Sequence, residues 1–93
     1  MKTIGLIGGL NWVSTIDYYR LLNQMVNDRL GGDNSARILM HSVNFADIRV
    51  LTDTNNWERI SEIMCSVAKQ LEYAGAEVLL LGANTIHKIA DDV

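Results

Sequence analysis

MKTIGLIGGLNWVST, residues 1–15, is the stretch of sequence that decides the fold of this 93-residue chain. Residues 4–7 are apolar at successive positions, which is typical of a strand buried on both faces in a parallel sheet covered by helices. Gly8 and Gly9 break the apolar run, and a helical pattern follows them. The stretch therefore predicts a strand, a glycine turn and the start of a helix.

The turn over residues 8–15 is also the first place to expect a binding site, because ligands of open α/β sheets bind beyond the carboxyl ends of the strands. Ser14 and Thr15 stand in front of the helical pattern. Ser14 with Asp17 three residues later resembles a capping box in which Asp replaces the usual Glu. We therefore expect Ser14 to cap a helix that begins at Thr15.

The composition indicates one small globular domain over all 93 residues, since a hydrophobic share of 48% excludes a disordered chain. A net charge of −3 gives no support for nucleic-acid binding, which needs a basic patch. The apolar runs are too short to span a bilayer, so no membrane contact is expected. A single cysteine and the lack of a visible signal peptide favour a cytoplasmic protein without internal disulfides.

The rest of the chain alternates between the two kinds of pattern. Apolar residues at helical spacing predict helices over residues 15–30, 56–73 and from 86 onwards, whereas residues 36–44 and 78–81 predict strands. This β-α-β-α-β-α order with short turns predicts an α/β fold, in which a parallel sheet with strand order 2-1-3 is the middle of three α/β/α layers. The connection over residues 44–51 has room for a helical turn, and Thr54 or Asn55 is expected to cap the helix that follows.

Each long helix carries its apolar residues in a stripe. The first stripe is expected to contain Ile16, Tyr19, Leu22, Val26 and Leu30. The second is expected to contain Trp57, Ile60, Met64, Val67, Ala68 and Leu71. Gly31 and Gly75 are expected to end the two helices. Tyr18, Leu21 and Met25 widen the apolar arc of the first helix, which fits either a deeply buried helix or a second contact surface.

A sheet with strand order 2-1-3 brings the turns after the first and third strands together at one edge. Between them, these turns offer the side chains of Ser14, Thr15, Asn84 and Thr85 and two helix N-termini, which suit a small carboxylate. The glycine turn matches neither the G-x-G-x-x-G nor the G-x-x-x-x-G-K-[ST] pattern, so a nucleotide site is disfavoured. A tight turn without any ligand is the simpler alternative.

Two other reactive side chains receive no role. His41 lies inside the second strand, where a packed, hydrogen-bonded histidine is the common case. Cys65 lies on a flank of its helix, about 120° from the middle of the stripe, and is interpreted as an inert thiol. Three strands leave both edges of the sheet bare, so the fold is expected to need more polypeptide, from a continuation of the chain or from a partner.

Three segments resemble one known family in order and at matching spacing, over essentially the whole chain. They are IGLIGGLNWVSTIDYYRLLN at residues 4–23, SARILMHSVNFADI at 35–48 and EYAGAEVLLLGANTIHKIAD at 72–91. They resemble the cofactor-independent aspartate/glutamate racemases, in the aspartate racemase branch. Members of that family are longer and have two similar α/β halves with the active site in the cleft between them. The resemblance makes this chain the first, N-terminal half, with the second half absent.

The resemblance implies an isomerase that uses neither pyridoxal phosphate nor a metal. One cysteine thiolate removes the α-proton from one face of the amino acid, and a second thiol returns a proton on the other face. Fixed donors must stabilise the carbanion-like state that forms in between. The residues that match the substrate-binding positions of the family are Gly8, Gly9, Ser14 and Thr15 in the first loop, and Asn84 and Thr85 after the third strand.

The chain departs from the family at the catalytic positions. The family has a run like C-x-N-T before the last helix, and in this chain Gly82 occupies the position of that first catalytic cysteine. The second cysteine would lie in the absent half. We therefore expect no catalytic residue in this chain and no racemase activity from the chain alone. His87 is a weak substitute base, since a solvated helix residue is more common, and Arg49 is a weak candidate for reading a side-chain carboxylate.

A second hypothesis comes from a different class of protein. A non-catalytic α/β module would keep the carboxylate site and self-associate through its bare sheet edge and the face of Tyr18, Leu21 and Met25. Both hypotheses expect a small amino acid or a dicarboxylate as the ligand, no cofactor, and either a homo-oligomer or a missing second half as the partner.

Overall fold

The sheet has the predicted order and direction. A computed structural model describes residues 1–82 and contains three parallel strands in the order β2-β1-β3. The strands are β1 (Ile4–Gly8), β2 (Ile38–Ser42) and β3 (Val78–Leu81). In the register of the sheet, Ile4 lies opposite Ile38 on one side and Val78 on the other. The central strand β1 is therefore paired with a neighbour along both of its edges, as the strand order 2-1-3 predicts.

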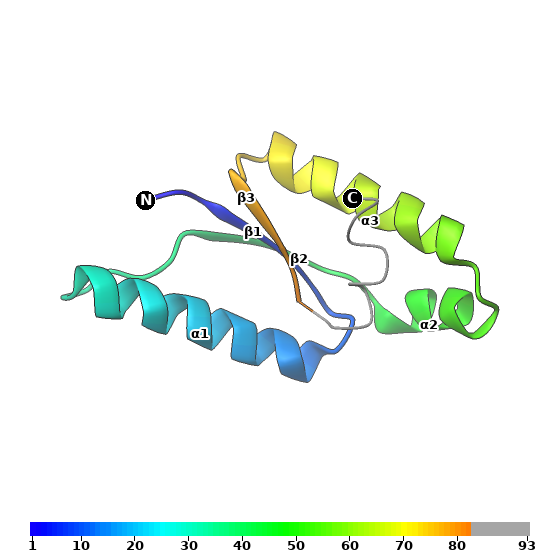
Figure 1. The fold of residues 1–93 in the computed structure, drawn as a ribbon, viewed down its shortest axis with the longest axis horizontal. Coiled ribbons are helices and arrows are strands. Elements are labelled where there is room, and N and C mark those ends of the chain that lie inside the picture. The colour runs from blue at the N-terminus through cyan, green and yellow to red at the C-terminus, as the bar shows by residue number, and fades with distance from the viewer. Residues whose placement is uncertain (83–93) are drawn as a thin grey trace.

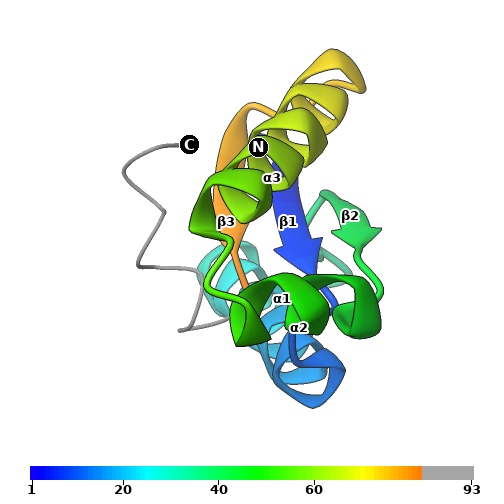
Figure 2. The ribbon, with the colours of Figure 1, turned by 90° about the vertical axis from the view of Figure 1, so that its right-hand side faces the viewer.

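The helices complete the expected three layers. They are α1 (Trp12–Leu30), α2 (Phe45–Asp53) and α3 (Trp57–Tyr73). Figure 1 shows α1 on one face of the sheet and α3 on the other, with α2 beside the end of the sheet. The view in Figure 2 has the same layers seen from that end. The helix expected from residue 86 onwards lies outside the described residues. Within residues 1–82, no helix combines the length and apolarity that crossing a membrane requires.

The core between the sheet and α3 is the one that the sequence predicts. Five of the six residues in the expected stripe are buried, namely Ile60, Met64, Val67, Ala68 and Leu71, and Trp57 packs against them. Ile7 of β1 belongs to the same core. Gly5 lets the layers approach closely, because a Cβ at this position would lie 2.8 Å from the Cβ of Ala76.

Helix α1 differs from the prediction in its rotation about its own axis. Of the expected stripe, Leu22 and Val26 are half-buried as predicted, whereas Ile16, Tyr19 and Leu30 are exposed. Thr15 and Tyr18 face inwards in their place. The physical reason lies at the start of the helix, where the Thr15 hydroxyl accepts a hydrogen bond from the Gly9 N–H. This bond directs Thr15 towards the sheet, and the residues at helical spacing from Thr15 follow it.

The caps of the helices also differ in part from the prediction. Asn11, not Ser14, caps α1, because its side-chain oxygen accepts from the Ser14 N–H at 3.3 Å. Asn56, not Thr54 or Asn55, caps α3 by accepting from the Arg59 N–H at 3.2 Å. In both places an Asn reaches the third residue of the helix, which is the geometry this side chain favours. Gly31 ends α1 as expected, with a φ of 71°.

The connection after β2 is more regular than predicted. The expected single turn is the nine-residue helix α2, which Asn44 caps by accepting from the Ala46 N–H at 3.0 Å. Ile48 is the buried residue of α2 and joins the core under α3. Helix α2 therefore closes the end of the core next to the carboxyl ends of the strands.

The different burial of two isoleucines gives a direct test of this fold. Ile60→Val removes a methylene group from a fully buried side chain and should lower the free energy of unfolding by about 1 kcal/mol. Ile16→Val makes the same change in a helix at a side chain that is 57% exposed and should alter it by less than about 0.5 kcal/mol. Urea denaturation followed by circular dichroism measures both. Equal losses would contradict the described rotation of α1.

Candidate functional site

The carboxyl ends of the three strands meet at one edge of the sheet, as the strand order predicts. The Gly82 N–H, just after β3, donates to the Ile7 carbonyl at 2.9 Å. On the other side of β1, the Val43 N–H donates to the Gly8 carbonyl at 2.8 Å. The chain therefore leaves β3 beside the glycine turn that follows β1. Of the predicted site residues, Asn84 and Thr85 lie outside the described residues, as does His87.

The turn at Gly9 has a shape that only glycine adopts without strain. Its φ is +89°, and a Cβ at this position would overlap the carbonyl oxygen of Val43. The same Cβ would lie 2.7 Å from Ser42 Oγ and from the Val43 nitrogen. Gly9 is thus pressed against the end of β2, and the lack of a side chain is what allows the β1–α1 loop, residues 9–11, to pass there.

Thr15 connects the β1–α1 loop to the first turn of α1. Its hydroxyl oxygen accepts from the Gly9 N–H at 3.0 Å, and its proton is donated to the Asn11 carbonyl at 3.1 Å. The side chain is 6% exposed and is the buried polar residue of the described chain. The Thr15 N–H also donates to the Asn11 carbonyl, at 3.0 Å. Loop and helix are therefore joined by hydrogen bonds around a buried side chain.

Ser14 and Asn11 complete the start of α1. Ser14 is half-buried in the first turn, next to Thr15, so the structure brings three predicted site residues, Gly9, Ser14 and Thr15, into one short loop and helix start. Asn11 was not among the predicted residues. The signal that identifies it is an Asn placed three residues before Ser14, which is the usual capping distance. The first turn of α1 points its positive end towards the edge where the strands finish.

Gly82 is buried at the same edge, under α1. A Cβ there would lie 3.0 Å from the Ile7 carbonyl oxygen and 3.6 Å from both Leu6 Cδ1 and Tyr18 Cδ2. Gly82 has no left-handed φ that would demand glycine. A small side chain at this position would start beside Tyr18 and would require the Ile7 carbonyl to shift by a few tenths of an ångström.

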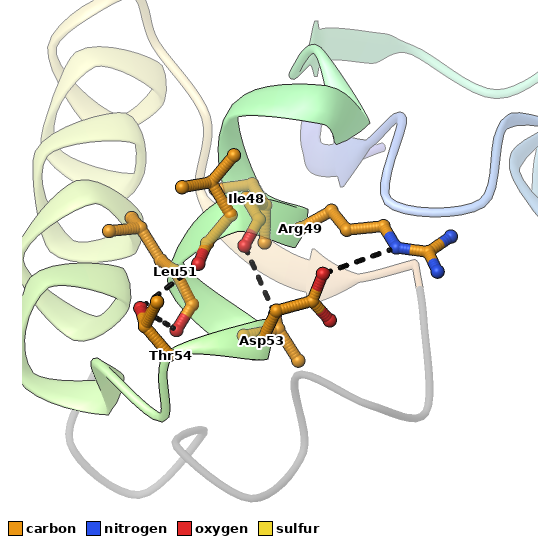
Figure 3. Close-up of polar contacts among 7 residues, drawn as sticks. Ile48, Arg49, Leu51, Asp53 and Thr54 are labelled. Atoms are coloured by element: carbon orange, nitrogen blue, oxygen red, sulfur yellow. Dashed lines mark hydrogen bonds and ion pairs between the residues drawn. The ribbon is translucent and has the colours of Figure 1, made fainter.

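Arg49, the weak candidate for recognising the side-chain carboxylate of a substrate, lies on α2. Figure 3 shows its side chain directed to Asp53, with Nε 3.6 Å from Asp53 Oδ2. Both side chains are about two-thirds exposed, at 67% and 66%. An exposed pair of this kind contributes little stability, so the pairing leaves Arg49 able to turn towards another anion.

The other reactive side chains do not join this edge as a cluster. His41 is half-buried in β2, opposite Ile7, and Cys65 is partly buried on a flank of α3, as predicted. A concave surface that includes Cys65 and Lys69 is lined by residues of α3 alone. Among residues 1–82, no three His, Cys, Asp or Glu side chains are grouped in a way that would hold a metal ion.

The comparison with known proteins confirms the family that the three segments resemble. A family model described as Asp/Glu/hydantoin racemase matches residues 7–93. The chain belongs to this racemase family. The match includes the glycine turn after β1, α1 and Gly82, which the structure places at the carboxyl edge of the sheet.

Two crystal structures are similar to this racemase-family chain over 99% of its length. One is a candidate Asp/Glu racemase from Yersinia pestis, with 47% identity and a TM-score of 0.97. The other is an aspartate racemase homologue from Pyrococcus horikoshii OT3, with 34% identity and a TM-score of 0.87. The racemase-family chain spans 40% of the length of each of them. The α/β unit described here thus corresponds to part of a larger racemase fold.

Glycine substitutions test the tightness of the β1–α1 loop. Gly9→Ala combines a left-handed φ with an overlap at Val43 and should cost about 3 kcal/mol or more of folding free energy. Gly32→Ala is the matched control, because its φ is +58° but a Cβ would meet nothing within 4 Å, and it should cost about 1 kcal/mol. Thermal and urea unfolding measure the difference. Similar losses in the two variants would mean that the loop is not pressed against β2.

Proposed function

We propose that this chain forms the N-terminal half of a cofactor-independent amino-acid racemase that acts on aspartate or glutamate. Its part in the active site is to bind the carboxylate of the substrate at the carboxyl edge of the sheet. Membership of the racemase family carries this proposal. The meeting of Gly9, Ser14 and the end of β3 at one edge supports it.

The chemistry explains why such a site suits this edge. The α-proton of an amino acid is weakly acidic, so a racemase must stabilise negative charge with donors that are already in place. The first turn of α1 supplies a positive helix end held by the Asn11 cap. In the proposed site, Ser14, Asn84 and Thr85 provide further donors to the same carboxylate. The net charge of −3 gives no general attraction for anions, so binding depends on these local groups.

We propose that proton transfer follows a two-base mechanism with a thiol on each face of the substrate. Gly82 has no proton to exchange, and it stands where the resemblance places the first of the two thiols. The second thiol belongs to the other half of the family fold. The chain by itself is therefore proposed to bind a small amino acid or dicarboxylate without racemising it. Its single cysteine agrees with a cytoplasmic setting, which we include in the proposal.

Binding and proton exchange are tested on the same protein. L-Aspartate, L-glutamate and succinate should shift the amide signals of residues 9–15 in nuclear magnetic resonance spectra, because these amides lie at the proposed site. The turn at residues 31–34, after α1, is the internal control and should not respond. Unchanged signals at residues 9–15 with all three ligands would refute the proposed site.

The loss of the α-proton signal of L- or D-aspartate in heavy water measures catalysis. Neither the natural chain nor Gly82→Cys should exceed the background rate, because the second thiol is still lacking. If Gly82→Cys exchanges the α-proton after the second half of the Yersinia pestis relative is added, then Gly82 is what prevents catalysis in the natural chain. Exchange of the α-proton by the natural chain alone would contradict the proposal that this chain does not racemise aspartate.

A second candidate function is favoured by the exposed apolar residues of α1. Trp12, Ile16 and Tyr19 lie on one side of α1 and are 67%, 57% and 50% exposed, and β3 is a partly exposed apolar strand at the edge of the described sheet. Surfaces of this kind mark contacts with other proteins. We therefore propose, as the alternative, a carboxylate-binding module that associates with copies of itself.

The mass of the protein in solution separates the two functions. The module predicts a folded dimer, measured by light scattering with and without succinate, whereas half of an enzyme predicts a monomer or aggregates. Ile16→Lys should dissociate the dimer, because it places a charge on the exposed apolar side of α1. Val50→Lys on α2 is the control, since Val50 is 64% exposed but lies on another helix. A dimer that survives Ile16→Lys would exclude this surface.

A further inference from the structure

We infer that Thr15 is a positioning residue of the proposed carboxylate site: its hydroxyl holds the β1–α1 loop in shape and does not touch the ligand. This inference rests on the proposed function and gives Thr15 a different role from the substrate contact that the sequence suggests. It concerns the loop of residues 9–11, which links the central strand to α1.

The hydrogen bonds of the Thr15 hydroxyl leave no proton for a ligand. The hydroxyl has one proton, and this proton is donated to the Asn11 carbonyl at 3.1 Å. The oxygen accepts from the Gly9 N–H at 3.0 Å in a buried position. A carboxylate accepts hydrogen bonds and would need that proton, so a direct contact would break a bond within the loop. Burial to 6% exposure makes such an exchange costly.

The methyl group of Thr15 fixes the other half of the turn. A Cβ at Gly8 would lie only 2.6 Å from Thr15 Cγ2, so the methyl group packs directly on the Gly8 backbone. On its far side, Gly9 is pressed against Ser42 and Val43 at the end of β2. The loop is therefore clamped between the Thr15 side chain and the end of β2.

Asn11 connects the Thr15 side chain to the proposed ligand site at the start of α1. The Asn11 carbonyl accepts hydrogen bonds from both the hydroxyl and the N–H of Thr15. The Asn11 side chain caps α1 by accepting from the Ser14 N–H. Loss of the hydroxyl leaves the buried Gly9 N–H without its acceptor and removes one of the two hydrogen bonds from Thr15 to the Asn11 carbonyl. The loop and the first turn of α1 would then shift relative to the end of β3, where the other donors of the proposed site begin.

Two variants of Thr15 and one control test the inference. Thr15→Val keeps the shape and removes the hydroxyl, whereas Thr15→Ser keeps the hydroxyl and removes the methyl group. Thr52→Val is the control, because the Thr52 hydroxyl donates to the Ile48 carbonyl at 3.1 Å and so joins residues of α2 and not of the loop. For each protein, the affinity for L-aspartate, the melting temperature and the hydrogen exchange of the Gly9 amide with and without L-aspartate are measured.

We expect Thr15→Val to weaken L-aspartate binding by about fivefold or more, since a neutral hydrogen bond is lost, and to expose the Gly9 amide to exchange. Thr15→Ser keeps the hydroxyl, so its affinity for L-aspartate and the exchange rate of its Gly9 amide should stay within about twofold of the natural chain. Thr52→Val should lower the melting temperature without a change in affinity. In the natural chain, the Gly9 amide should stay protected when L-aspartate binds.

Two results would overturn the inference. One is a Thr15→Val protein that binds L-aspartate as well as the natural chain does. The other is loss of Gly9 protection when L-aspartate binds, since a hydroxyl that turns to the ligand must release the loop. If the natural chain binds none of the three ligands, the proposed function fails, and the Gly9 exchange in Thr15→Val and Thr15→Ser still decides whether Thr15 holds the loop.

Discussion

The contact between the glycine turn after β1 and its two neighbours, Thr15 on α1 and the end of β2, is the constraint on which the rest of the structure depends. Gly9 passes so close to Val43 that a side chain does not fit, and its N–H is satisfied by the buried Thr15 hydroxyl. Main-chain pairing fixes β1 within the sheet, but this contact fixes where the chain goes next. It therefore sets the position of α1 and the shape of the edge at which the strands end.

The same contact explains why the two faces of the sheet are covered so differently. Helix α3 buries five of the six residues of its stripe against Ile7 and the rest of the core, as its amphipathic pattern predicts. Helix α1 is rotated by its link to Gly9, and part of its apolar surface, including Ile16 and Tyr19, stays exposed. In relatives that are longer than this chain, further polypeptide is available to cover such a surface.

Placed in the racemase family, the chain shares the backbone fold of longer relatives. The fold is shared with the Yersinia pestis relative at a TM-score of 0.97, so the strand ends and the glycine turn keep the family arrangement. At Gly82, the φ is not left-handed, but a Cβ would lie 3.0 Å from the Ile7 carbonyl oxygen, so a side chain there needs a shift of the backbone. Gly9 and Gly82 therefore differ in kind, because Gly9 needs glycine for its left-handed φ, whereas at Gly82 only the close approach to β1 restricts a side chain.

The sequence by itself determined the strands, the long helices and their order, the 2-1-3 sheet, the buried stripe of α3 and the racemase family, because periodicity, turns and motifs are properties of neighbouring residues. It placed Gly9, Ser14 and Thr15 at the same turn for the same reason. Only the tertiary structure decided that Asn11 is the cap of α1, that α1 turns Tyr18 rather than Tyr19 inwards, and that the Thr15 hydroxyl faces Gly9. Helix rotation and the partner of a hydroxyl depend on contacts between separate elements, which local patterns do not encode.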